Sequence, residues 1–189
     1  KEMLKNEMDF CVKNNILYVK CSINPFEKFG KIKLTTQQSL LFVTSNTMVE
    51  NLDLQYTGAH AILHKNKITN NVCISNCIIE NIGGSIQNYD TFTRYGNGIE
   101  FWNHANNTLV ENCIIRNVYD AGYTVQGSDV TEELGFYKNI CRNNIFINCT
   151  YDIEMFCRND KSNKEICKLE KQQIYNNISV NQGRGWGFD

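Results

Sequence analysis

Two glutamates and a threonine hold the same position in three short apolar segments. They are Glu100 in Gly98–Phe101, Thr124 in Gly122–Val125 and Glu154 in Asp152–Met155. Side chains of a β-strand alternate between its two faces, so these three residues are expected to point outward while their apolar neighbours point inward. If the segments are stacked strands, the two carboxylates stand two layers apart, with roughly 9–10 Å between their backbones.

That separation suits acid and base catalysis by a pair of carboxyl groups. Inverting glycosidases hold their carboxyl groups ~6.5–9.5 Å apart, so that one protonates the leaving oxygen while the other activates water. The spacing is too large for a pair that retains configuration, which needs ~5–5.5 Å. Two outward glutamates on a sheet are also an ordinary surface feature, and that alternative stays open.

Other polar and aromatic residues accompany the carboxylates in this alignment. His60 belongs to the preceding repeat and is expected beside the Glu100 strand, as a base, as a residue that orients sugar hydroxyls, or as a hydrogen-bonded structural histidine. Aromatic faces stack on sugar rings and arginine pairs with carboxylates, which predicts substrate contacts for a wider set. That set is Arg94, Tyr95, Trp102, Asp120, Thr124, Asp152 and Arg158.

The sequence predicts no metal ion and no cofactor. Asp120 and Asp152 fall one repeat apart, but no third acidic residue joins them, whereas calcium prefers six to eight oxygen ligands. A glycine-rich phosphate loop, a His-Glu-x-x-His motif and a nucleophile elbow are all missing from the sequence.

The segments that must position these residues belong to a repeat. Each copy begins at an asparagine corner, continues with a short apolar run and has a second asparagine five residues after the first. The copies are Asn76–Ile82, Asn112–Val118, Asn143–Cys149 and Asn176–Gln182, with a fainter one at Asn51–Leu54. Self-similarity at a spacing of ~20–50 residues predicts a stack of structural repeats.

The apolar runs are typical of strands rather than helices, because they are short, rich in Ile, Val and Phe, and end at turn residues. About three runs occur in each repeat. Three short strands per repeat predict an all-β, right-handed parallel β-helix, a single-stranded solenoid of about five coils in which equivalent strands pair. Stacked asparagine amides would satisfy one another and the corner backbone.

The first part of the chain has a different pattern. Asp9–Lys20 predicts a hairpin and Lys31–Leu34 predicts a half-exposed strand. We therefore expect a β-structured lead-in over residues 1–47 and β-helix coils over residues 48–189, with a separate small β subdomain as the alternative. Gly185–Asp189 has the pattern of a further strand start, which predicts a fragment of a longer solenoid.

Composition limits the possible partners. The net charge of the 189 residues is -1 and no long run has one sign, so neither nucleic acid nor a membrane is predicted as a partner. No apolar stretch approaches the ~20 residues of a membrane span. Lys1–Asn6 lacks the apolar core of a signal peptide. The composition leaves the oligomeric state open.

Nine cysteines are present, and their spacing does not form a zinc motif. Cys77 and Cys113 occupy the same repeat position, and a free cysteine behaves as a small buried hydrophobe. Stacked thiols in the core are therefore expected. Cys157 and Cys167 flank a polar loop that a disulfide between them would close.

The Asn-x-Ile-x-Asn units followed by Gly-Ile-x-Phe resemble the right-handed β-helix repeats of the pectate-lyase-like superfamily, over about residues 48–189. Arg94–Asn103 and Tyr119–Gly122 resemble a bacterial branch known mainly by its fold. The resemblance implies a secreted or cell-surface protein whose outward sheet face binds a polysaccharide or oligosaccharide and cleaves it, as a glycoside hydrolase or a polysaccharide lyase. Because fold does not fix function, a non-catalytic structural or carbohydrate-binding segment of a larger surface protein is the alternative.

Overall fold

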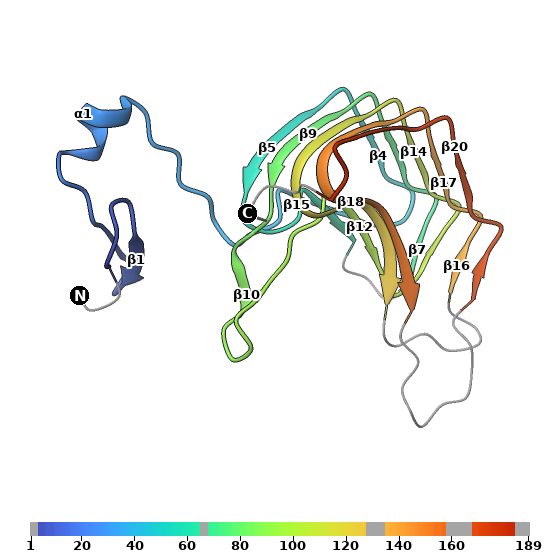
Figure 1. The fold of residues 1–189 in the computed structure, drawn as a ribbon. Helices are drawn as coiled ribbons and strands as arrows, with labels where there is room; N and C mark the ends of the chain where they lie inside the picture. Colours follow the sequence, from blue (N-terminus) through green and yellow to red (C-terminus); the bar gives the residue numbers. More distant parts are fainter. Residues whose placement is uncertain (1–3, 65–67, 128–134, 158–167, 184–189) are drawn as a thin grey trace. The chain divides into compact units, whose positions relative to one another are not determined.

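The computed structural model describes residues 4–64, 68–127, 135–157 and 168–183 (Figure 1). The chain divides into two compact units, Lys1–Leu34 and Thr35–Asp189. From the sequence the change of structure was expected at Met48. The strand β3 (Leu41–Val43) nevertheless pairs in parallel with β6 (Ile62–His64), so this part of the expected lead-in contributes a strand to the second unit.

The first unit contains the expected hairpin. β1 (Phe10–Lys13) pairs antiparallel with β2 (Ile16–Val19), and the two turn residues Asn14 and Asn15 have φ values of 52° and 60°. Left-handed conformations at both turn positions match the twist of a two-residue hairpin, and asparagine tolerates them well. The hairpin prediction is confirmed.

A short helix follows the hairpin, although the sequence was not expected to form one. α1 (Pro25–Phe29) begins after Asn24, whose side chain accepts a 3.0 Å hydrogen bond from the Phe26 amide. Proline at the first helical position and an asparagine cap both favour a helix start. The strand predicted over Lys31–Leu34 is wrong: these residues continue from the helix without pairing to another described strand.

The second unit consists of parallel sheets. The largest contains, in order of pairing, β3, β6, β12 (Ile99–Trp102), β15 (Ile114–Gly127), β18 (Ile145–Cys157) and β21 (Ile178–Val180), and β5 (Asp53–Thr57) and β9 (Ile78–Ile82) join it at the first half of β15. A second sheet contains β7 (Thr69–Asn70), β13 (Ala105–Asn106), β16 (Phe136–Tyr137) and β19 (Leu169–Glu170). A third contains β4 (Met48–Glu50), β8 (Cys73–Ser75), β14 (Leu109–Glu111), β17 (Ile140–Arg142) and β20 (Gln173–Tyr175).

Each strand of these sheets pairs with the strand that follows it by one sequence repeat, and we call one such pass of the chain a layer. Ile79, Ile115 and Phe146, expected to lie in one file, are directly paired neighbours. Figure 1 shows successive layers as curved bands lying one behind another. The all-β class and the parallel pairing predicted from the repeats are confirmed.

The second asparagine of each repeat lies inside β9, β15 and β18 and directly after β21. Asn81, Asn117, Asn148 and Asn181 have φ values of 59°, 53°, 53° and 57°. Their side chains bond in series, since each Nδ2 donates to the Oδ1 of the previous layer at 3.1, 3.0 and 3.2 Å. Asparagine suits this position for two reasons. It tolerates the left-handed backbone conformation, and its side-chain amide both donates and accepts a hydrogen bond.

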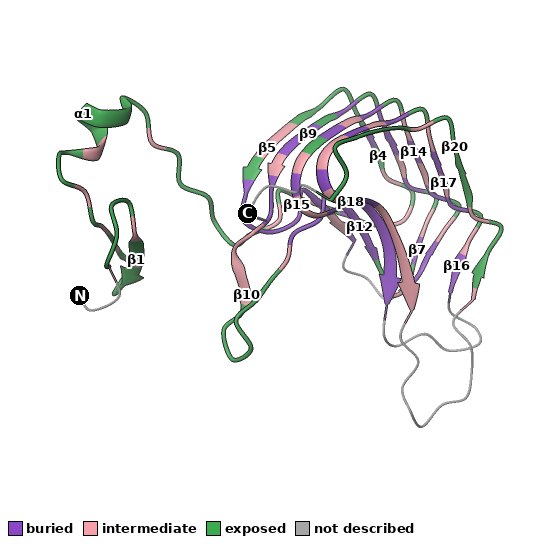
Figure 2. Cartoon of the chain, viewed as in Figure 1, coloured by how far each residue is buried: buried purple, intermediate pink, exposed green. Residues whose placement is uncertain are grey.

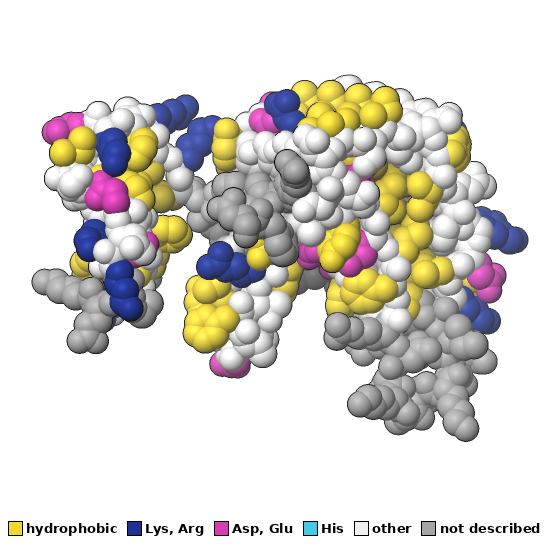
Figure 3. All heavy atoms as spheres, viewed as in Figure 1, with side chains coloured by type: hydrophobic (Ala, Val, Ile, Leu, Met, Phe, Trp, Pro, Cys, Tyr) yellow, Lys and Arg dark blue, Asp and Glu magenta, His cyan; other side chains and the backbone are white. Residues whose placement is uncertain are grey.

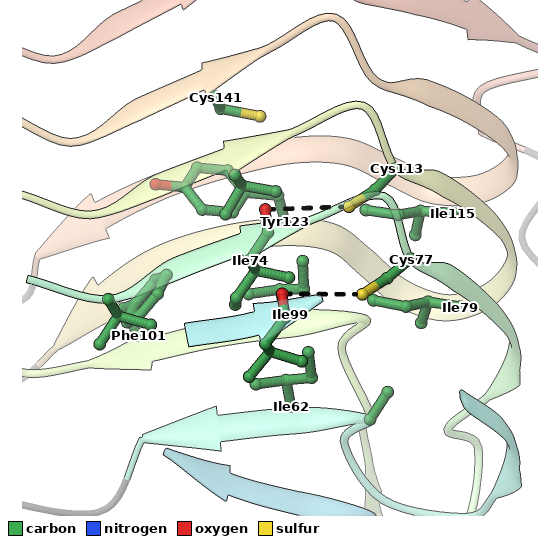
Figure 4. Packing of buried hydrophobic residues seen from close by; sticks show 14 of the residues in the cluster. Ile62, Ile74, Cys77, Ile79, Ile99, Phe101, Cys113, Ile115, Tyr123 and Cys141 are labelled. Atoms are coloured by element: carbon green, nitrogen blue, oxygen red, sulfur yellow. Dashed lines mark hydrogen bonds between the residues drawn. The ribbon is translucent and has the colours of Figure 1, made fainter. Parts of the chain in front are cut away.

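The space between the sheets is filled by apolar side chains. Figure 2 colours the buried segments of the strands purple, and Figure 4 draws part of the core as sticks. Four thiols belong to this core, at Cys77, Cys113, Cys141 and Cys149. Dashed lines in Figure 4 join the sulfurs of Cys77 and Cys113 to backbone carbonyls of the preceding layer. The expectation of stacked free thiols is confirmed for these four.

Burial raises the pKa of Cys141 and of Cys149 to about 12. Cys157 is disulfide-bonded, and its expected partner Cys167 lies outside the described residues. Cys141 and Cys149 therefore favour the protonated state. The one described half-cystine lies at the end of β18.

Apolar side chains also reach the outer surface of the second unit, and Figure 3 shows them in a row along its upper edge. In the register of the large sheet, Ile78, Ile114, Ile145 and Ile178 form one outward column. The first and last of these are exposed and the middle two are half-buried. Stacked isoleucines shield one another even where they face solvent.

A hairpin interrupts the layers between β9 and β12. Its strands β10 (Ile86–Asn88) and β11 (Thr93–Arg94) pair antiparallel. The two ends of the hairpin meet at Gly83 and Gly96, whose φ values are 91° and 154°, and a Cβ on Gly96 would lie 2.2 Å from the Cα of Gly83. Only glycine fits this contact, which fixes where the chain returns to the sheet just before Asn97.

Candidate functional site

The column of polar residues expected on one face of the large sheet has the expected register. Glu100 pairs with Thr124 and Thr124 pairs with Glu154, so the two glutamates stand two layers apart. The residues on either side of each are apolar. Ile99, Phe101, Tyr123 and Val125 belong to the buried core, and Ile153 and Met155 pack against it.

The column is less open to solvent than an outward position on a bare sheet. Glu100 is 5% exposed, Thr124 is 0% exposed and Glu154 is half-buried. The Thr124 hydroxyl is buried between the two glutamate layers and has no hydrogen-bond partner. The face is therefore not the flat, solvated surface that an ordinary outward column would form, and an unpaired hydroxyl lies within it.

His60, Glu100 and Asn97 form a buried polar cluster. His60 Nδ1 lies 2.8 Å from Glu100 Oε2, and the Asn97 side-chain amide donates to the same oxygen at 2.7 Å. The Asn97 backbone amide also donates to His60 Nδ1, at 3.1 Å. One ring nitrogen cannot accept that hydrogen and donate to the carboxylate at once, so these two contacts of His60 Nδ1 exclude each other as hydrogen bonds.

Asn97 connects this cluster to the next layer. Its side-chain oxygen accepts a 2.8 Å hydrogen bond from the backbone amide of Ala121, and its own side chain is almost completely buried. Its backbone carbonyl accepts a 3.0 Å hydrogen bond from the Ala61 amide, so all four of its polar groups are used. The two N–H donors orient Glu100 and His60 together. We did not identify Asn97 from the sequence as a site residue, although it stands between Gly96 and Gly98 in the segment that carries the family resemblance.

Tyr95 covers the histidine. The two rings stack with centroids 5.5 Å apart at an angle of 30°. Burial, and then the charge of Glu100, raise the pKa of the Tyr95 phenol, so the hydroxyl stays protonated and can donate a hydrogen bond at neutral pH. Tyr95 reaches this position because the hairpin returns to the sheet at Gly96.

Two further carboxyl groups are coupled electrostatically to Glu100. Burial raises the pKa of Asp120, the charge of Glu100 raises it further, and His60 lowers it. Burial also raises the pKa of Glu154, with added contributions from Asp120 and Glu100. Like charges near one another in a poorly solvated place oppose ionisation, so these carboxyl groups favour the protonated form more than free side chains do.

The other predicted site residues lie apart from this cluster or outside the described chain. Asp152 occupies the place that Gly122 holds one layer earlier, and its carboxylate accepts from the Ser179 hydroxyl in the next layer. Trp102 is exposed at the end of β12, and Arg94 is exposed in β11 of the hairpin. Arg158 lies outside the described residues. The structure thus brings together His60, Tyr95, Glu100, Asp120, Thr124 and Glu154.

A pocket of about 530 Å³ adjoins the cluster at His60 and Tyr95. Its other lining residues are Gln37, Gln38, Ser39, Phe42, Ala59, Leu63 and Gln87. None of these was singled out from the sequence. Most come from the expected lead-in, Gln87 comes from the hairpin, and Ala59 and Leu63 come from β6 and the residues just before it. In the described ranges, no group of three or more His, Cys, Asp or Glu is arranged to hold a metal ion.

Comparison with models of protein families, with curated proteins and with solved structures produced no match. Among the described helices, none has the length and apolar character needed to cross a bilayer. The geometry of the cluster is therefore the basis on which a function is proposed.

Proposed function

We propose that the protein binds a polysaccharide on the face of the large sheet that carries Glu100 and Glu154, and hydrolyses a glycosidic bond there. We also propose that its layers are coils of a right-handed parallel β-helix of the pectate-lyase-like type. Pairing between strands one repeat apart supports the second proposal, since a β-helix requires that register in every sheet.

One observation carries the functional proposal: the His60–Glu100–Asn97 cluster is buried on the same sheet face as Asp120 and Glu154, whose pKa values are raised. Burying a carboxylate beside a histidine and two more acids costs stability, because each charge loses water and faces like charges. Groups of perturbed acids within one site are typical of acid–base catalysis.

The arrangement suggests distinct roles for the two glutamates. Glu154, with its raised pKa, is the general acid that gives its proton to the glycosidic oxygen as the carbon–oxygen bond breaks. Glu100, oriented by Asn97 and His60, is the base that takes a proton from the attacking water, whose oxygen bonds to the anomeric carbon. The two-layer separation leaves room for that water and predicts inversion.

Thr124 stands between the two glutamates in the register, and its buried hydroxyl lacks a partner. Because Thr124 is 0% exposed, the side chains over it must move before a sugar hydroxyl can bond to it. Tyr95 presents a protonated phenol beside His60 and is suited to bind the same sugar. These two residues are proposed to hold substrate rather than to transfer protons.

A non-catalytic, carbohydrate-binding or structural segment is the second candidate. The observation that favours it is the low exposure of Glu100, which leaves little of its carboxylate open to water. In that case the cluster would fix the hairpin to the sheet through His60 and Tyr95. The two candidates differ in what happens when the carboxylates are neutralised.

The test is a screen of the protein against a panel of plant and bacterial polysaccharides, with release of new reducing ends as the readout. Glu100→Gln and Glu154→Gln should each lower the rate by 100-fold or more, about the contribution of acid–base catalysis. Glu170→Gln, an exposed glutamate on β19, is the matched control and should keep full activity. Activity that survives both site substitutions would remove the proposed mechanism.

A further inference from the structure

Two apolar residues continue the register of Glu100 into the two preceding layers, β6 and β3. Glu100 pairs with Leu63, and Leu63 pairs with Phe42. Both Leu63 and Phe42 line the pocket beside His60. The pocket therefore lies on the same sheet face as the column of Glu100, Thr124 and Glu154 and continues it across the strands. Leu63, the lining residue paired with Glu100, is one layer away from it.

The pocket has the chemistry of a sugar site. Phe42 is 49% exposed and offers a ring face at the start of the column. Carboxamides from Gln37, Gln38 and Gln87 surround it. The side-chain NH2 groups of Gln37 and Gln87 each donate to two protein acceptors, so these two residues offer their side-chain oxygens as acceptors for sugar hydroxyls. Gln87 is fixed by a 3.1 Å bond to the Gly58 carbonyl, and Gln37 by a 2.9 Å bond to the Tyr89 hydroxyl.

The charges around the site argue against an acidic sugar. Among the described residues, no lysine or arginine lines the pocket. The acids Glu100 and Glu154 lie along the adjoining column, and Asp120 is coupled electrostatically to Glu154. The ion pairs formed by described arginines lie elsewhere, at Glu80 and Glu111. A uronate carboxylate placed here would face these like charges, and no cation among the described lining residues would neutralise it. That repulsion is strong where water is scarce.

We infer that the pocket lined by Phe42, Leu63 and Gln87 binds an uncharged sugar unit, and that the polysaccharide cleaved at the adjoining column is neutral. This inference rests on the function proposed above and narrows it. Elimination requires a carboxylate on the sugar to acidify the C5 proton, so a neutral substrate leaves hydrolysis, in which water adds across the glycosidic bond. The chain of sugars would run across the strands, from Phe42 towards Glu154.

The experiment measures binding by titration calorimetry with the Glu100→Gln protein, which should retain binding. The probes are neutral hexasaccharides of the cello-, xylo-, manno- and laminari- series, and hexamers of galacturonate and mannuronate. At least one neutral hexasaccharide should bind, and Phe42→Ala should weaken it by about fivefold or more as ring stacking is lost. Phe42→Tyr, which keeps the ring, should bind as before.

Phe92→Ala is the matched control, because Phe92 is 73% exposed in the hairpin and does not line the pocket. It should change affinity by less than twofold. Equal losses in Phe42→Ala and Phe92→Ala would overturn the placement of the subsite. Tighter binding of the uronates, or an unsaturated uronate among the products of the unmodified protein, would contradict the proposal that the substrate is neutral. The proposal that the protein cleaves a polysaccharide would remain. Binding of no hexasaccharide, together with no reducing ends in the screen, would remove both proposals.

Discussion

Asn117 occupies a middle position in the ladder of stacked asparagines Asn81, Asn117, Asn148 and Asn181, and its replacement by alanine tests why this position uses asparagine. Its side chain donates to Asn81 at 3.1 Å and accepts from Asn148 at 3.0 Å. Each such bond contributes about 0.5–1.5 kcal/mol net. The φ of 53° costs alanine a further ~1–2 kcal/mol. Asn117→Ala is therefore expected to lower the free energy of unfolding by about 2–5 kcal/mol.

Two companion variants separate these contributions. Asn117→Gly loses the same two hydrogen bonds but accepts the left-handed backbone, so it should be about 1 kcal/mol more stable than Asn117→Ala. Asn181→Ala changes a residue with nearly the same φ, 57°, that makes only one ladder bond, to Asn148. It should lose about 1 kcal/mol less than Asn117→Ala, since it breaks one bond fewer.

Urea unfolding followed by circular dichroism measures all three changes, with equal slopes required for the comparison. Asn117→Ala within 0.5 kcal/mol of the unmodified protein would refute the role assigned to the ladder. Equal stability of the Ala and Gly variants would contradict the contribution assigned to the left-handed backbone, while the contribution assigned to the two hydrogen bonds would remain.

Three further outcomes are expected. Gly96→Ala should lower the free energy of unfolding by about 1–3 kcal/mol in urea titration, because its Cβ would meet the Gly83 backbone; Gly30→Ala, with open space around it, should lose less. Since the pKa values of Asp120 and Glu154 are raised above 3.8 and 4.5, the folded protein keeps protons that the unfolded chain has released, so stability should fall as pH rises above those values. The double variant Asp120→Asn/Glu154→Gln should flatten that fall in unfolding curves measured across the same pH range, and an unchanged slope would contradict the assignment. In alkylation followed by mass spectrometry, partly exposed thiols should react in the folded protein, and buried ones only after denaturant is added. The first group is Cys11, Cys21 and Cys73 and the second is Cys77, Cys113, Cys141 and Cys149.

The stacking of the chain was predictable from the sequence because two independent patterns mark each repeat. Apolar runs of strand type identify the elements, and the asparagine pairs fix which residues of successive repeats lie over one another. Ile79, Ile115 and Phe146 could therefore be aligned without coordinates, and so could Glu100, Thr124 and Glu154. The left-handed backbone at the corners was missed, although asparagine is the residue most often found there after glycine.

The contents of the site were less predictable, since they depend on how loops return to the sheet. Tyr95 reaches His60 because the backbones of Gly83 and Gly96 are in contact. The spacing of these two glycines in the sequence does not predict that contact. Asp152 was aligned with the outward residues by strand alternation, but its carboxylate bonds to Ser179. Irregular pairing between Val118 and Ala121 in β15 breaks strict alternation in this part of the sheet.

The pocket was missed for a different reason. Phe42 was assigned to a lead-in, so its register with Leu63 and Glu100 was not considered. Pairing of β3 extends the large sheet by one layer towards the N-terminus, and that layer supplies the apolar start of the column. A pattern search for a weak first repeat near Leu41–Val43 would have found it.

The configuration of the first product tests the proposed pair of glutamates most directly. Proton NMR during cleavage of a neutral polysaccharide reports the newly formed anomer before it equilibrates in water. Because Glu100 and Glu154 stand two layers apart, the first product should have the anomeric configuration opposite to that of the substrate bond. A product that retains the configuration would contradict the assignment of these two residues as acid and base.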